Sequence, residues 1–452
     1  MTINASRRRF LSLAVKYSVL GAAAPLALNL AGIRAASAAD TSGAYKALVC
    51  IFLYGGNDAH NTIIPYDLPT YKKYADVRGP LAVPRESLTP TVISPTNGWG
   101  QSQEFALHPM LAPLKTLFDD GKLVPIMRVG TLLQPTTVAD YINKRNLPPK
   151  LMSHNDQFSL WQSMLAEGAT SGWGGRLGDL LASSNLGNGL LTNMSVGNSA
   201  IFSNGKQSTE FTVAPSGIQF VKDIQGLEGT AQIISHRLSR SNQHLLLGEL
   251  STRYKTALIG SNSLTNSATF STFNPVFPQT ELGSQLAMVA KIIAANQDLG
   301  MKRQVFFVSM GGFDNHSGVA ILHPPLLQAL ANSMSAFQNT IDSLGLGSQV
   351  TTFTASDFGR SFVPNGDGAD HGWGGHHFIM GGTVKGKTWA GELPTFTLKG
   401  PDDIGNGRLL PAVSIDQYAG TLASWMGVTD SELPTICPNI SKFSAKNLGF
   451  MA

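Results

Sequence analysis

The chain of 452 residues contains little cysteine and little charge. Its two cysteines, Cys50 and Cys437, cannot supply the cross-links of a small disulfide-stapled protein. Charged residues make up 14% of the chain and hydrophobic residues 42%, which is enough for a packed core and excludes general disorder. The 47 glycines follow no three-residue period, so a collagen-like fibre is excluded and numerous tight turns are expected instead.

The chain also lacks the basic surface of a nucleic-acid-binding protein. The formal net charge is +4, but residues 1–38 hold five of the 33 Lys and Arg residues and no acid. The remainder carries 33 − 5 = 28 basic and 29 acidic side chains, a net charge of −1. Because phosphate backbones are bound by clustered positive charge, we expect no nucleic-acid partner.

Residues 1–38 have the features of a twin-arginine export signal. Arg7 and Arg8 precede a mildly apolar stretch that ends in the small-residue cleavage site Ala36–Ala38. A retained membrane anchor is the alternative, but a lysine and a proline interrupt the stretch. We expect export by the twin-arginine translocase, cleavage that leaves no stable transmembrane anchor, and a periplasmic or extracellular location. That compartment permits a disulfide between the two cysteines, and a buried thiol at each position is equally compatible.

Apolar runs and helical patterns alternate along the rest of the chain. The runs are continuous, as in strands covered on both faces, and span 46–53, 123–129, 304–310, 349–355 and 377–380. Helical patterns occupy 282–293, 330–344 and 415–426. The alternation predicts one α/β domain over 39–452 with a mostly parallel sheet and helices on both faces. The Ser-, Asn-, Gly- and Thr-rich region from about 185 to 278 predicts an insertion or cap over the sheet.

Acids and histidines collect where the predicted strands begin and end. Because the carboxyl ends of parallel strands meet at one edge of a sheet, these side chains could build a metal site. Carboxylate and imidazole ligands favour Zn²⁺ or Mn²⁺ over Mg²⁺ or Ca²⁺, bound as one ion or two. Taken singly, each aspartate is also a common turn former and each histidine a common buried polar residue. The candidates are Asp58, Asp314, His316, Asp357, His371 and His376.

Four motifs resemble the bacterial family called domain of unknown function 1501. They are GGNDAHNTIIPY (55–66), GGFDNHSG (311–318), SDFGR (356–360) and DHGWGGHHFIMGG (370–382), with shorter matches at 107–109, 153–154 and 172–173. The resemblance covers nearly the whole mature chain and implies membership of the alkaline phosphatase/sulfatase superfamily. It therefore implies a three-layer α/β/α sandwich with metal ligands at strand ends.

The resemblance also implies individual roles. Asp58 matches the first-strand metal ligand, Asp314 and His316 a later pair, and His371 the late histidine, with His376 as its alternative. Asp357 matches an Asp-His pair, but here the next residue is Phe358, which cannot bind a metal. That departure puts a second metal site in question.

The resemblance gives less guidance on the nucleophile and the substrate contacts. Ser153 at the start of a helical pattern is the first candidate nucleophile and Thr62 the second, while a plain helix N-cap is the alternative for Ser153. Arg360 could bind a phosphate or sulfate group, or it could pair with a buried acid. Trp373 could contact substrate or simply pack in the core.

Two functions remain open from the sequence. The first is an exported metal-dependent hydrolase that acts on a small anionic phosphate or sulfate ester. The common formylglycine form of a sulfatase is disfavoured, because neither cysteine lies in a C-x-P-S-R segment. The second is an exported protein that retains the alkaline-phosphatase-like fold without catalysis and acts in binding or assembly.

Overall fold

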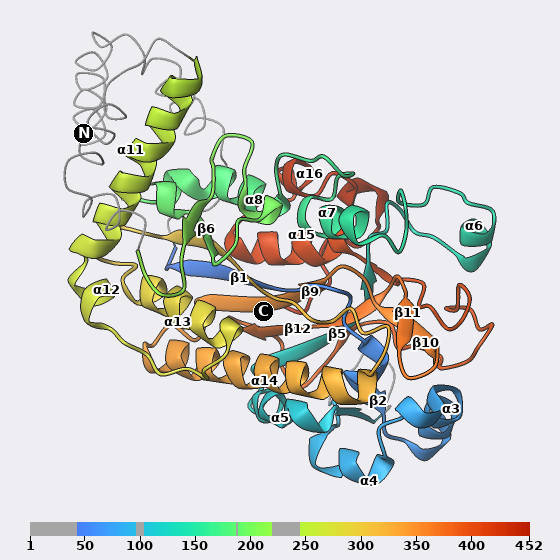
Figure 1. Cartoon of the computed structure of the whole chain (residues 1–452). Coiled ribbons are helices and arrows are strands. Elements are labelled where there is room, and N and C mark those ends of the chain that lie inside the picture. The colour runs from blue at the N-terminus through green and yellow to red at the C-terminus, as the bar shows by residue number, and fades with distance from the viewer. Residues whose placement is uncertain (1–42, 96–103, 187–188, 219–244) are drawn as a thin grey trace, which may run out of the picture.

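A computed structural model describes residues 43–95, 104–186, 189–218 and 245–452 (Figure 1). The predicted twin-arginine signal lies outside these described residues. Among the helices of the described ranges, none combines the length and the hydropathy that crossing a bilayer requires.

A nine-stranded sheet forms the centre of the molecule, in the order β13-β5-β12-β9-β1-β8-β6-β7, with β14 paired to β5. The strands run parallel except for β12, which is antiparallel to both of its neighbours, β5 and β9. The predicted mostly parallel sheet is thus confirmed. The strands are β1 (Lys46–Leu53), β5 (Leu123–Gly130), β6 (Asn193–Val196), β7 (Phe211–Val213), β8 (Arg303–Met310), β9 (Val350–Ser356), β12 (Gly375–Gly381), β13 (Ala390–Gly391) and β14 (Val413–Ser414).

Helices cover both faces of the sheet, which gives the predicted three layers (Figure 1). Successive side chains of β1 point to opposite faces, so Val49 and Ile51 enter one hydrophobic core while Cys50 and Phe52 enter the other. The first core is closed by α5 (Ala112–Asp119), α13 (Glu281–Ala294) and α14 (Val319–Ser343). The second is closed by α7 (His154–Ser163), α8 (Trp173–Leu181), α15 (Ile415–Met426) and α16 (Leu433–Ile436).

Local sequence signals explain where two of these helices lie. Ser414 begins α15 with a capping box and Gly427 ends it at φ 107°, which are the bounds of the helix predicted over 415–426. In contrast, α14 starts well before the predicted residue 330. Its first turns contain Pro324 and Pro325, which are unfavourable inside a helix and hid the pattern.

The region predicted as a cap contributes two strands to the main sheet. β6 pairs in parallel with β8, and β7 extends the sheet beyond it. Of the two predicted alternatives, an insertion or a cap over the sheet, the cap does not describe this part of the chain. Both strands are short and contain Ser, Asn or Thr, so their apolar character is weak. The helices α11 (Leu245–Asn266) and α12 (Ala268–Thr272) follow at the same end of the molecule (Figure 1).

Smaller elements surround the other end of the sheet, where β1, β8 and β9 finish (Figure 1). They comprise a three-stranded sheet, a hairpin and short helices. These are β2 (Ile63–Pro65), β3 (Val92–Ile93) and β4 (Phe105–Leu107), the hairpin of β10 (Arg360–Pro364) and β11 (Ala369–His371), and the helices α3 (Leu68–Arg78), α4 (Arg85–Leu88) and α6 (Val138–Ile142).

The two cysteines are buried free thiols. Cys50 lies on β1 and Cys437 directly follows α16, and both belong to the second core. Of the two alternatives left open by the sequence, the structure therefore has the pair of buried thiols.

Candidate metal site

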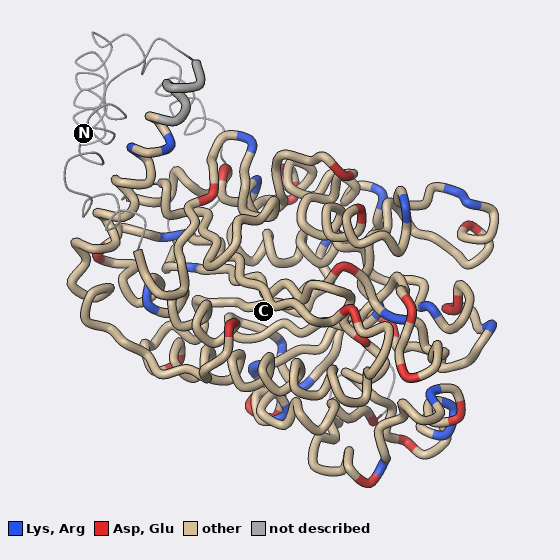
Figure 2. Tube along the Cα trace, in the orientation of Figure 1, with Lys and Arg blue, Asp and Glu red and all other residues tan. Residues whose placement is uncertain are grey.

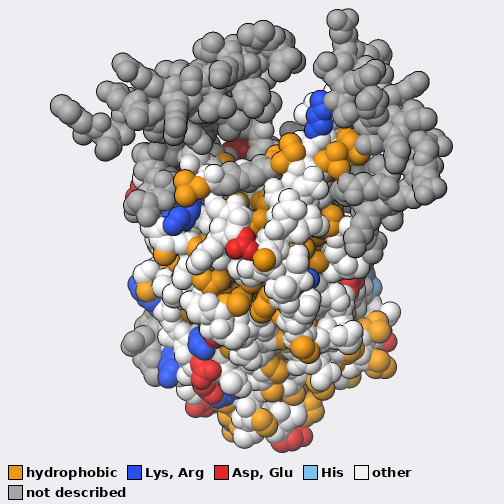
Figure 3. All heavy atoms as spheres, turned by 90° about the vertical axis from the view of Figure 1, so that its left-hand side faces the viewer, with side chains coloured by type: hydrophobic (Ala, Val, Ile, Leu, Met, Phe, Trp, Pro, Cys, Tyr) orange, Lys and Arg blue, Asp and Glu red, His pale blue; other side chains and the backbone are white. Residues whose placement is uncertain are grey.

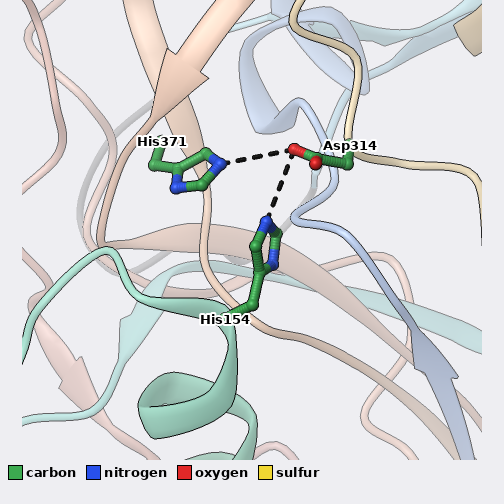
Figure 4. A group of neighbouring side chains, drawn as sticks. All are labelled: His154, Asp314 and His371. Atoms are coloured by element: carbon green, nitrogen blue, oxygen red, sulfur yellow. Dashed lines mark hydrogen bonds and ion pairs between the residues drawn. The ribbon is translucent and has the colours of Figure 1, made fainter.

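The candidate site lies at the carboxyl edge of three neighbouring parallel strands, β8, β1 and β9. The turn after β8 carries Asp314 and the turn after β9 carries Asp357. The first residue of α7, His154, and the last residue of β11, His371, reach the same place (Figure 4). Acidic and basic positions gather around this end of the sheet (Figure 2), whereas no histidines gather on the visible described surface of the opposite end (Figure 3).

Two glycines after β1 allow the three turns to pack together. Gly55 and Gly56 have φ values of 115° and 86°, which side-chain-bearing residues rarely adopt. A Cβ on Gly55 would overlap the backbone nitrogen of Asp314, and one on Gly56 would overlap the ring of Phe358. The glycines of the GGNDAHN motif therefore bring the β8 and β9 turns against β1, which places their acids near each other.

Three histidines surround one carboxylate oxygen, Oδ1 of Asp314. His154, Asp314 and His371 each place one ligand atom within 4.8 Å of the others. The Nε2 atoms of His154 and His371 lie 3.5 Å and 3.3 Å from this oxygen (Figure 4). His316 adds a third imidazole, whose Nε2 is 3.2 Å from the same oxygen and 2.7 Å from Nε2 of His371.

Hydrogen bonds behind two of these rings fix which nitrogen faces the centre. Nδ1 of His371 lies 2.7 Å from the carbonyl oxygen of Met152, which can only accept, so Nδ1 carries the proton. Nδ1 of His154 lies 2.6 Å from the carboxylate of Asp357 and donates in the same way. In the neutral rings, both Nε2 atoms therefore direct lone pairs toward Asp314, as in the carboxylate–histidine arrangement typical of metal sites.

A cation bound between these lone pairs and the carboxylate would add to the positive charge that Arg360 already supplies to Oδ1 of Asp314. Two ligands about 2.0–2.1 Å from one ion at a tetrahedral angle are about 3.3–3.4 Å apart, close to the observed spacing of the Asp314 oxygen from each imidazole. Nε2 of His154 is also buried without a hydrogen-bond partner. The donor set and spacing therefore fit a divalent metal ion.

The charges around Asp314 keep it ionised. Partial burial raises its pKa, but the hydrogen bond and the charge of Arg360, followed by His154 and His316, outweigh burial and lower the pKa to about 2. The hydrogen bond to Asp357 raises the pKa of His154. Burial lowers the pKa of His371 and so favours its neutral, ligating form.

Phe358 fills the position where the superfamily pattern has a histidine. Its buried ring lies 4.8 Å from the ring of His154 and 4.5 Å from that of His371, measured between centroids. It therefore packs against two imidazoles of the candidate site and offers no ligand there. Asp357 stands behind His154, where one oxygen also accepts from the Gly55 amide at 3.2 Å and the other is buried without a partner.

Of the predicted ligands, Asp357, Asp58 and His376 lie outside the group, so the structure does not place these three as ligands of the ion. Asp58 is buried, forms an ion pair with the buried guanidinium of Arg78, and accepts from the His60 amide at 3.1 Å. His376 is buried on β12, where its Nδ1 accepts from the backbone amide of Arg128 at 3.2 Å. Burial lowers the pKa of His376 to about 3, so it is a neutral core residue.

Arg360 is positioned as a structural residue, not as a substrate ligand. Its buried guanidinium donates to the carbonyl oxygens of residues 55, 56, 313 and 369 and, at 2.5 Å, to Asp314. Its hydrogen-bonding groups are thus already engaged in joining the turns after β1 and β8. Of the two roles expected for Arg360, the structure shows the pairing with an acid, Asp314. It does not support a contact of Arg360 with a phosphate or sulfate group.

The candidate nucleophiles and Trp373 also have clear positions. Ser153 occupies the N-cap of α7, but its Oγ donates to Asp156 at 2.8 Å rather than to the helix backbone. Thr62 is fully buried and donates to the Asp58 carbonyl at 2.7 Å, which makes it unsuited to attack a substrate. Trp373 is buried and donates from Nε1 to Thr131 at 2.9 Å, as expected of a packed aromatic.

His154 is the member of the group that the sequence did not identify as a ligand. It precedes no predicted strand and lies far in sequence from the other members. The one signal was the Ser153-His154 match to the family, at the start of a predicted helix. Its role becomes visible only once α7 is docked beside the turn after β9.

The fold and this group of residues define an α/β protein with a His/Asp candidate metal site at the carboxyl edge of its sheet. A family model described as "Protein of unknown function (DUF1501)" matches residues 45–430, and the chain belongs to this family. The resemblance proposed from the four motifs is thus confirmed.

Solved structures similar to this chain include members of the alkaline phosphatase superfamily. The C-terminal periplasmic domain of EcEptC from Escherichia coli has a TM-score of 0.38 at 9% identity over 89% of this chain and 88% of that chain. A superfamily protein from Vibrio parahaemolyticus has a TM-score of 0.33 at 10% identity over 85% and 67%. The lipoteichoic acid synthase LtaP from Listeria monocytogenes has a TM-score of 0.32 at 8% identity over 89% and 78%. No curated protein matches the chain.

Proposed function

We propose that the protein is an exported metal-dependent hydrolase of small phosphate or sulfate esters. One observation carries the proposal: Nε2 of His154 and Nε2 of His371 both face Oδ1 of Asp314, with their protons held on the far side of each ring. A site that gathers three lone pairs at metal-ligand spacing is costly to form unless a cation binds there.

The metal that suits this site is Zn²⁺ or Mn²⁺. Its donors are one carboxylate and two imidazoles, with His316 able to supply a third, and such nitrogen-rich sets favour transition metals over Mg²⁺ or Ca²⁺. We assign one ion, because Phe358 removes the nitrogen ligand on which a second position would depend and Asp58 is neutralised by Arg78. When bound, the ion would activate water and neutralise charge on the oxygens of the ester.

The chain's own residues have separable tasks in this proposal. Asp357 and the Met152 carbonyl hold the two imidazoles in orientation, and Arg360 holds Asp314. His316 is about half exposed, with a side-chain exposure of 46%, and its Nε2 lies 2.7 Å from Nε2 of His371. We assign His316, in its imidazolium form, the delivery of a proton to the leaving-group oxygen of the ester, a general-acid role that leaves a neutral imidazole.

In this proposal the hydroxyl of Ser153 is the nucleophile that attacks the ester. The alternative is direct attack by water. Ser153 precedes His154 in the chain, and its hydroxyl is bonded to Asp156, a carboxylate that could accept its proton. Asp156 is in turn 3.6 Å from Lys150. Ser153→Ala separates the two routes, because only the serine route forms a covalent enzyme intermediate.

The second candidate is a non-catalytic exported protein that uses the same fold for binding or assembly. Two observations favour it: a phenylalanine stands at 358, and the donors of Arg360 are engaged within the protein. A single structural metal at the group would be compatible with this function.

Metal content combined with turnover distinguishes the two functions. Purified mature protein would be analysed for bound metals and assayed on chromogenic phosphomonoesters, phosphodiesters and sulfate esters, with and without chelator. The hydrolase predicts turnover that chelator abolishes and that Zn²⁺ or Mn²⁺ restores. Asp314→Asn should lose both metal and turnover, while Asp119→Asn, an exposed aspartate on α5, serves as the matched control. A folded protein that is inert on all three ester classes would favour the second function.

A further inference from the structure

A hydrolase of anionic esters needs a cation that holds the oxygens of the substrate, and Arg360 is not available for this task. The donors of its guanidinium are engaged by backbone carbonyls and Asp314, and its side chain is 1% exposed. Lys150 carries charge near α7, but it already lies 3.6 Å from Asp156 and 3.3 Å from Glu167. Binding of an anionic substrate would therefore need another basic residue near the candidate metal site.

Arg408 is anchored directly to a residue of that site. Its Nε donates to the backbone carbonyl of His371 at 2.7 Å, so the guanidinium is fixed beside the residue whose imidazole faces Asp314. Nη1 makes a long 3.4 Å bond to the Gly405 carbonyl. Among the acids that the structure describes, Nη2 approaches Asp370, at 3.9 Å, which is beyond hydrogen-bond distance. The side chain is partly exposed, with a relative exposure of 21%.

Asp370 links this arginine to the open side of the site. One oxygen of its half-exposed carboxylate lies 3.8 Å from Nδ1 of His316, and the other lies 3.9 Å from Arg408. Ion pairs at such exposure and distance contribute little and exchange readily for a better partner. His316, Asp370 and Arg408 thus form a row at the rim, with the one weakly paired guanidinium at its end.

We propose that Arg408 binds the terminal oxyanion of the substrate, a tetrahedral phosphate or sulfate group, while Asp370 holds the guanidinium in the free protein. This inference rests on the proposed function, since the anion must also reach the metal site. With Nε anchored to the His371 carbonyl, Nη1 and Nη2 form the outer pair of donors of the guanidinium, and such paired donors match two oxygens of a tetrahedral anion. Arg408 then replaces Arg360 as the residue that selects anionic esters.

Titration calorimetry of the metal-loaded protein with inorganic phosphate and with inorganic sulfate tests this assignment. Arg408→Gln removes the charge, and we expect it to weaken anion binding about 10- to 100-fold, as for loss of a charged hydrogen bond. Arg408→Lys should recover part of the affinity. Asp370→Asn should bind the anion more tightly, because it removes a competing negative charge. Arg85→Gln is the matched control, since Arg85 also anchors Nε to a carbonyl, that of Tyr66, but belongs to α4.

A separate metal titration of each variant distinguishes anion binding from support of His371. The inference predicts that Arg408→Gln retains the wild-type metal affinity while losing anion affinity. If metal and anion affinity fall together, Arg408 acts by positioning His371 and the inference is wrong. If wild type binds metal and anion but Arg408→Gln binds the anion equally well, the inference alone is overturned. If wild type binds metal without any anion, the proposed hydrolase and this inference both fail.

Discussion

Replacing Asp357 by asparagine should weaken metal binding without unfolding the protein. Asparagine keeps an oxygen that can accept from Nδ1 of His154 and from the Gly55 amide, so the turn after β9 retains its contacts. It removes the negative charge that makes the His154 imidazole a better ligand. The buried position of Asp357 means that water cannot replace this charge.

The size of the effect follows from linkage between metal binding and folding. At a free metal concentration of 100 times Kd, wild type should gain about 2.7 kcal/mol of unfolding free energy. Loss of the carboxylate behind a metal-bound histidine typically weakens affinity about 10- to 100-fold. At the same metal concentration, the gain of Asp357→Asn should then be only about 1.4 to 0.4 kcal/mol.

Urea unfolding in chelator and in excess Zn²⁺ or Mn²⁺ measures this gain for each protein. The chelator sample removes any effect of the substitution on the metal-free fold from the comparison. Asp119→Asn should show the full wild-type gain, because this exposed side chain lies on α5 and pairs with Lys115. An equal gain in Asp357→Asn and wild type would show that Asp357 is a turn former with no influence on a metal.

Three further predictions address the fold and the chemistry. Burial lowers the pKa of His60 and His323 to about 4. The stability that these neutral histidines contribute is therefore present above about pH 6.5 and is lost as the pH falls toward 4. At pH 5 the free energy of unfolding should be lower by about 2 kcal/mol for each histidine. An unfolding midpoint unchanged between pH 7 and 5 would contradict this. Gly55→Ala should lower the free energy of unfolding by about 2–4 kcal/mol, because its φ is disfavoured and its Cβ overlaps the turn after β8. Gly121→Ala, with open space around its Cβ position, should lower it by about 1 kcal/mol. Equal melting temperatures of the two variants would refute the packing argument. Ser153→Ala should abolish a covalent enzyme intermediate detectable by mass spectrometry, and unchanged labelling would exclude this serine.

The sequence predicted those elements whose signals are local and strong. The apolar run of β1 and the capping box and C-terminal glycine of α15 specify their elements without help from distant residues. The antiparallel direction of β12 could not be predicted, because a strand buried on both faces has the same composition in either direction. β6 and β7 were hidden for the opposite reason, since these short, polar strands depend on tertiary pairing, β6 with β8 and β7 with β6.

The candidate site was predicted only in part, because local sequence signals identify some of its residues and tertiary packing places the others. Asp314 and His371 were found because each adjoins an easily recognised strand or glycine-rich turn. His154 was missed because it enters through the docking of α7, which no local pattern encodes. Asp58 follows β1 as the superfamily pattern requires, but the arginine that neutralises it comes from the end of α3, twenty residues further along the chain.

The most direct test of the central claim is an anomalous diffraction measurement on crystals of the protein grown with Zn²⁺ or Mn²⁺. The account predicts one strong anomalous peak about 2.0–2.2 Å from Nε2 of His154, Oδ1 of Asp314 and Nε2 of His371. A peak centred instead on Asp58 or His376, or no peak at the edge of β8, β1 and β9 in crystals soaked well above micromolar metal, would contradict it.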